Sequence, residues 1–193
     1  MRRGVLALAL SLTLTYAARA HAPVPGLDGF PGGLLHPVLV PAHLLALIGL
    51  GLFIGQQRMP GLTALFFAAG LAGGLSAIAS AVGETPANTV LLVSAAITGA
   101  LTALAVAMPR VIGWLLAGVI GVAIGLDSPP HVISVTEATI MLIGTGIGAL
   151  IVLIAVTAAA AALKRDWQRI GVRVLGSWTA ASAILVLATR FAR

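Results

Sequence analysis

Long apolar runs separated by short breaks constrain this chain more than any other feature of its sequence. A helix that spans a bilayer needs about 20 mainly apolar residues. Only 8% of the 193 residues are charged, whereas a soluble domain carries about a quarter. We therefore expect an all-α fold, a polytopic membrane helical bundle of about six transmembrane helices. The predicted spans are Leu34–Gly55, Leu62–Val82, Thr89–Met108, Val111–Leu126, Val135–Leu163 and Gln168–Thr189.

The first twenty residues have the order of a secretory signal peptide. Arg2 and Arg3 precede an apolar run, which ends in the small-residue pattern Ala18-Arg19-Ala20. We predict cleavage after Ala20; an uncleaved first helix is the alternative and gives the remaining chain the same orientation. The expected organisation is a signal peptide (1–20), a periplasmic N-terminal segment (21–33) and a six-helix transmembrane domain (34–193).

Basic residues follow alternate spans, which predicts the orientation of the chain. Loops rich in Lys and Arg stay in the cytoplasm. Arg58 follows the first span, Arg110 follows the third, and the junction of the fifth and sixth spans is surrounded by Lys164, Arg165, Arg169 and Arg173. We expect a multi-pass protein of the bacterial inner (plasma) membrane with its mature N-terminus in the periplasm. Arg190 and Arg193, near the C-terminus, do not fit this pattern.

Glycines recur at a spacing of four residues in several spans. Small residues at this spacing allow helix backbones to approach closely in lipid, so the pattern predicts tight packing. The pairs are Gly51 with Gly55, Gly70 with Gly74, Gly121 with Gly125, and Gly144 with Gly148.

The histidines and most carboxylates fall at the predicted outer side of the membrane. His43 lies inside the first span, and an ionisable residue within a span is a functional hypothesis by default. Imidazole and carboxylate ligands together suit divalent ions such as nickel, cobalt or zinc. The candidate metal ligands are His36, His43, Glu84, Asp127 and His131.

The spacing of His36 and His43 limits how they can act together. Seven residues of straight helix would separate them by roughly 10 Å along the axis, which is too far for one ion. Either Pro37 and Pro41 break the segment and bend His36 back toward His43, or the two histidines bind an ion one after the other along its path.

Each candidate also has an ordinary structural role. His36 could end a loop at the headgroups, His43 could hydrogen-bond a neighbouring helix, and His131 could be a loop histidine. Glu84 could cap the third helix or face water, and Asp127 could cap a turn before Pro129 and Pro130.

Several other classes of protein are excluded. The absence of cysteine rules out thiolate metal sites. The net charge of +6 comes from a few residues at helix ends rather than from a patch with aromatics, so we expect no nucleic-acid partner. No nucleophile elbow, phosphate loop or His-Glu-x-x-His motif is present, so we do not expect an enzyme.

The first span resembles the opening motif of the HupE/UreJ family, whose members are nickel permeases associated with hydrogenase and urease gene clusters. That motif has a His-Pro pair followed by Asp-His; His36 and His43 match it, and Ala42 occupies the Asp position. Glu84 resembles a family glutamate between the second and third spans. In a second motif, His131 matches a family histidine, and Asp127 stands where another histidine is expected.

The residues and the resemblance together predict a membrane permease or metal-capture protein for a divalent transition metal, with nickel or cobalt favoured. The alternative is a non-transporting membrane subunit or assembly factor of a larger complex. We expect no organic cofactor. The expected partners are the lipid bilayer and either metalloenzyme maturation proteins or membrane partner subunits.

Overall fold

The computed structural model describes residues 28–79, 86–130 and 134–191. These residues form seven helices and no strand. The helices are α2 (Gly29–Leu39), α3 (Pro41–Gln57), α4 (Pro60–Ala79), α5 (Ala87–Leu104), α6 (Arg110–Leu126), α7 (Val135–Ala162) and α8 (Asp166–Phe191). The predicted helical membrane bundle is confirmed, and the predicted signal peptide lies outside the described residues.

The first apolar run is divided into two helices, which is the main departure from a straight span over Leu34–Gly55. The helix axis bends by 68° between α2 and α3. Val40 between them is extended, with φ −90° and ψ 111°, because a residue that precedes a proline is pushed out of the helical region. Pro41 then starts α3, at a position where its missing N–H is tolerated.

Four helices are long and apolar enough to cross a membrane by themselves, namely α4, α5, α7 and α8. The bent pair of α2 and α3 makes a fifth candidate if it is counted as one span. Helix α6 has 17 residues, at the short end of the range for a span, as its predicted bounds had indicated. Many large apolar side chains point outward, including Leu65, Leu104 and Leu185, each more than 60% exposed. Such a surface fits lipid rather than water.

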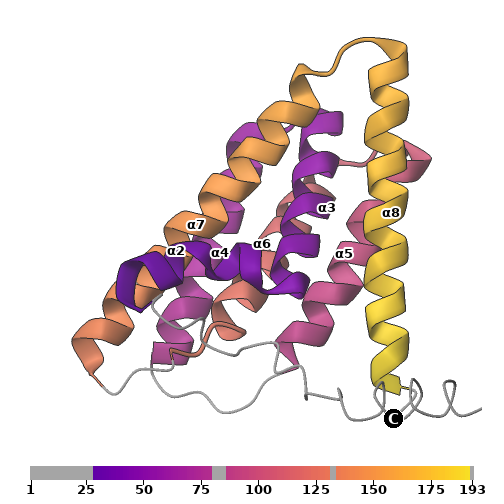
Figure 1. The fold of residues 1–193 in the computed structure, drawn as a ribbon. Coiled ribbons are helices and arrows are strands. Elements are labelled where there is room, and N and C mark those ends of the chain that lie inside the picture. Colours follow the sequence, from indigo (N-terminus) through magenta and orange to yellow (C-terminus); the bar gives the residue numbers. More distant parts are fainter. Residues whose placement is uncertain (1–27, 80–85, 131–133, 192–193) are drawn as a thin grey trace, which may run out of the picture.

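Helix α3 lies at the centre of the bundle and packs against α5, α7 and α8 (Figure 1). Leu47 and Leu50 of α3 are fully buried among Leu91 of α5 and Ile120 and Ile124 of α6. The surrounding helices pair most closely as α4 with α6, α2 with α7, and α5 with α8.

The glycines spaced by four residues lie at helix contacts. A Cβ added at Gly74 of α4 would lie 2.3 Å from the Val122 carbonyl oxygen of α6, and one at Gly148 of α7 would lie 2.1 Å from the Leu34 carbonyl oxygen of α2. No larger side chain fits at such distances. The predicted close packing is therefore confirmed, since glycine lets one backbone rest on another.

The two ends of the bundle carry different side chains. We call the end with Arg58, Arg110, Lys164, Arg165 and Arg169 the basic end. The opposite end, where α3 and α5 begin and α6 and α8 finish, we call the histidine end (Figure 1).

Candidate metal centre

The break at Val40 brings His36 and His43 together. Their ring centres are 5.1 Å apart and the ring planes meet at 73°, an edge-to-face arrangement. This is about half the axial separation that seven residues of straight helix would impose. Of the two predicted arrangements, the one in which the prolines break the segment and return His36 toward His43 is confirmed.

His43 is completely buried, and a carboxylate from another helix reaches it. Its Nε2 lies 3.1 Å from Oδ2 of Asp127, whose side chain is 12% exposed. Asp127 directly follows the last residue of α6 and is its C-cap. A buried imidazole is expected to have such a partner, because an unsatisfied polar group away from water destabilises the fold.

The polar contacts extend from Asp127 to two residues that the sequence did not single out as site residues. Asn88, in the first turn of α5, donates from Nδ2 to Asp127 Oδ2 at 2.9 Å. Arg190, near the end of α8, donates from Nη2 to Asn88 Oδ1 at 2.5 Å. The four side chains therefore form a continuous network from a buried histidine to an exposed arginine.

No local signal in the sequence could have identified Asn88 or Arg190. Asn88 sits at the start of an apolar run, where it looks like an ordinary helix-start residue. Arg190 stands out in the sequence only as an exception to the positive-inside pattern. The residues of the network are 84, 39 and 102 positions apart along the chain, so only the packing of the helices reveals them.

The remaining predicted ligands, Glu84 and His131, lie outside the described residues. Two other carboxylates, Asp28 and Glu137, are exposed. Ala42, at the position of the motif carboxylate, is buried in the main apolar core. The carboxylate beside His43 thus comes from the end of α6 rather than from the neighbouring residue in α3.

The separations are compatible with metal coordination. Two ligand atoms held about 2.1 Å from one ion at octahedral or tetrahedral angles lie about 3.0–3.4 Å apart, a range that includes His43 Nε2 and Asp127 Oδ2. Two imidazole rings bound to one ion at a tetrahedral angle have centres roughly 5 Å apart, as His36 and His43 do. Within residues 28–79, 86–130 and 134–191, however, no group of three or more histidine or carboxylate side chains is arranged so that it could hold a metal ion.

The fold and this polar centre define a polytopic helical membrane protein with a buried histidine–carboxylate pair at one end. A family model described as HupE / UreJ protein matches residues 8–186. The chain therefore belongs to the HupE/UreJ family, which is associated with nickel or cobalt transport or with accessory functions. Searches of curated proteins and of solved structures give no match.

Proposed function

We propose that this protein captures a divalent transition metal ion, with nickel or cobalt favoured, and serves as a permease for it. His36, His43 and Asp127 would supply the first ligands. The observation that carries the proposal is the return of His36 to His43 across the break at Val40, beside a carboxylate from α6. Packing alone does not require two imidazoles and a carboxylate at one place within an apolar bundle.

The ion would replace the hydrogen shared by His43 and Asp127. Both groups already lie at a ligand–ligand distance, so little movement of α3 or α6 would be needed. His36, His43 and Asp127 do not by themselves form a group that could hold a metal ion among the described residues, and in the proposal Glu84 or His131 completes the site. An incomplete or exchangeable ligand set suits a protein that must release its ion.

The proposed place of the protein is the bacterial inner membrane, with the histidine end in the periplasm and the basic end in the cytoplasm. The supporting observation is that Arg58, Arg110 and the α7–α8 junction share one end of the bundle, as the positive-inside rule requires of cytoplasmic segments. Metal would then be captured from the periplasm.

Uptake of radioactive nickel or cobalt by cells that express the protein tests the proposal. We expect His43→Ala and His36→Ala to abolish most uptake, while the protein level in the membrane stays unchanged. Thr98→Ala is the matched control, because Thr98 is also a fully buried polar residue but its hydroxyl bonds only to carbonyls of its own helix. Since metal ligation needs neutral imidazole, uptake should also weaken as the pH falls.

One observation favours a second candidate, a non-transporting membrane subunit or assembly factor. Hydrogen bonds link His43, Asp127, Asn88 and Arg190 into a network that joins four helices, and such a network can serve stability alone. Purified protein that binds neither nickel nor cobalt, but carries a stoichiometric partner chain, would establish this candidate and exclude metal capture.

A further inference from the structure

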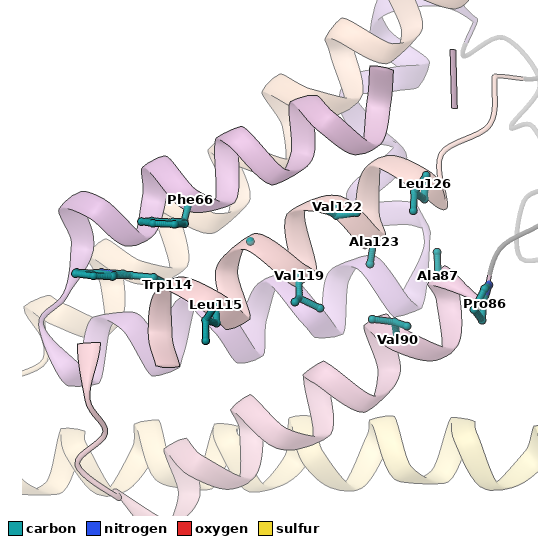
Figure 2. Close-up of a pocket in the computed structure, with 11 residues that line it drawn as sticks. Phe66, Pro86, Ala87, Val90, Trp114, Leu115, Val119, Val122, Ala123 and Leu126 are labelled. Atoms are coloured by element: carbon teal, nitrogen blue, oxygen red, sulfur yellow. The ribbon is translucent and has the colours of Figure 1, made fainter. Parts of the chain in front are cut away.

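An apolar groove of about 430 Å³ runs along the outer face of α6, between α6 and α5 (Figure 2). Only apolar and aromatic residues line it, among them Phe66, Val90, Leu115, Val119, Val122 and Leu126. Elsewhere in the bundle neighbouring helices touch through glycine, with backbone against backbone. The groove is a place where two neighbouring helices leave space for another apolar molecule.

The groove meets a positively charged hollow at the basic end. Trp114 lines both the groove and an adjoining cavity of about 230 Å³, whose other walls include Arg58 and Arg110. Both arginines are exposed, and among the described residues neither is paired with a carboxylate. The mouth of the apolar groove therefore presents two unneutralised guanidinium groups.

The groove is long enough to hold one lipid tail. Twelve residues separate Trp114 from Leu126 at its two ends, which is about 18 Å of helix. One leaflet accounts for half of a hydrocarbon core that is about 30 Å thick. At the mouth, Trp114 stacks on Phe66 with ring centres 5.6 Å apart, and tryptophan favours the level of the headgroups.

We propose that this surface is a binding site for an anionic phospholipid. The phosphate group lies between Arg58 and Arg110, and one acyl chain lies in the groove against Leu115, Val119 and Val122. Guanidinium groups bind phosphate through paired hydrogen bonds, and basic pockets between transmembrane helices bind anionic headgroups. A helix from a partner protein is the less favoured occupant, because it would leave both arginines unneutralised unless it carried acidic residues at that level.

Native mass spectrometry of the whole purified protein, equilibrated with equal amounts of phosphatidylglycerol and phosphatidylcholine, tests the headgroup site. We expect one phosphatidylglycerol to be retained in preference to phosphatidylcholine. The double variant Arg58→Gln/Arg110→Gln should retain it roughly thirtyfold more weakly. Lys164→Gln/Arg165→Gln is the matched control, since it removes the same charge from the same end without touching either cavity, and it should behave as wild type. Equal losses in both double variants, or no loss in either, would overturn the proposal.

A second pair of variants tests the groove. Val119→Trp fills it and should reduce retention of both lipids, whereas Val93→Trp, on an exposed position of α5 outside the groove, should not. Should Val119→Trp fail to fold, Val119→Gln places a polar amide in the same groove and makes the same test. Retention unaffected by any Val119 variant, or a second protein chain found over α6 by cross-linking, would show that a lipid is not the occupant.

Discussion

Charged and polar side chains differ in burial and in pairing between the two ends of the bundle. At the histidine end, His43 is fully buried and is joined to Asp127 and Asn88. At the basic end, Arg58 and Arg110 are exposed and pair with no carboxylate among the described residues. Burying ionisable groups in a membrane protein is unfavourable unless they are paired, whereas exposed arginines at the headgroups are not penalised. This difference supports the proposals that metal binds at the histidine end and that the basic end contacts lipid headgroups.

The largest expected effect tests what holds the histidine end in place. Gly148→Leu puts a side chain against the backbone of α2, where even a Cβ would lie 2.1 Å from the Leu34 carbonyl oxygen. We expect a loss of about 3 kcal/mol or more in the free energy of unfolding, measured in mixed micelles, together with loss of metal binding. Gly73→Leu is the control, because a Cβ at Gly73 meets nothing within 4 Å. If both variants are equally stable, the α2–α7 contact does not fix the site.

The next effect separates a structural role of Asp127 from a ligand role. Asp127→Ala leaves buried His43 without this hydrogen-bond partner and should lower the free energy of unfolding by about 1–3 kcal/mol. Asp127→Asn keeps an oxygen acceptor but loses the charge, so its stability should stay closer to wild type. Isothermal titration with nickel should show weaker binding in both variants. Nickel affinity that is unchanged in Asp127→Asn would argue that the carboxylate is structural only.

A smaller effect is expected at Asn88, which contacts Asp127 but is not itself a proposed ligand. Asn88→Ala removes the hydrogen bond to Asp127 Oδ2 and should destabilise the protein by about 0.5–1.5 kcal/mol. Nickel affinity should fall by a few-fold, because the carboxylate is less well oriented. Thr89→Ala, at the neighbouring position of α5, serves as the control. A nickel affinity equal to wild type would show that Asn88 does not contribute to metal binding.

The smallest perturbation tests the orientation of the two ends. The chain has no cysteine, so a single introduced cysteine can be labelled selectively. Val135→Cys and Arg165→Cys lie at exposed positions near opposite ends of α7, and each should change stability by less than about 0.5 kcal/mol. In intact spheroplasts, a membrane-impermeant maleimide should label Val135→Cys but not Arg165→Cys. After permeabilisation it should label both. The reverse result would place the histidine end in the cytoplasm.

Much of the fold could be predicted from the sequence, because the relevant signals are local. Apolar runs gave helix bounds within a few residues, for example 110–126 for α6 against the predicted 111–126. Glycines spaced by four marked the contact faces, since their effect depends only on the absence of a side chain. The bend at Val40 was one of two alternatives, because a proline pair allows a break without determining its angle.

The site was less predictable because its members come from distant parts of the chain. His36, His43 and Asp127 were selected for their residue type and their side of the membrane, and the structure brings these three into one neighbourhood. Asn88 and Arg190 were not selected, since an asparagine at a helix start and an arginine near a terminus both have commonplace explanations. Their role in the network depends on how α5, α6 and α8 are arranged around α3.

The attachment of both halves of the first apolar run to the same helix has a mechanical consequence. Helix α2 rests on α7 at Gly144 and Gly148, and α3 rests on α7 further along, at Gly51 and Gly55. The distance between the two imidazoles is thus fixed by the contacts of α2 and α3 with α7, rather than by Val40 alone. A rigid tilt of α7 would therefore carry the two imidazoles together and keep their separation, whereas a bend in α7 between the two sets of contacts would change the distance between them.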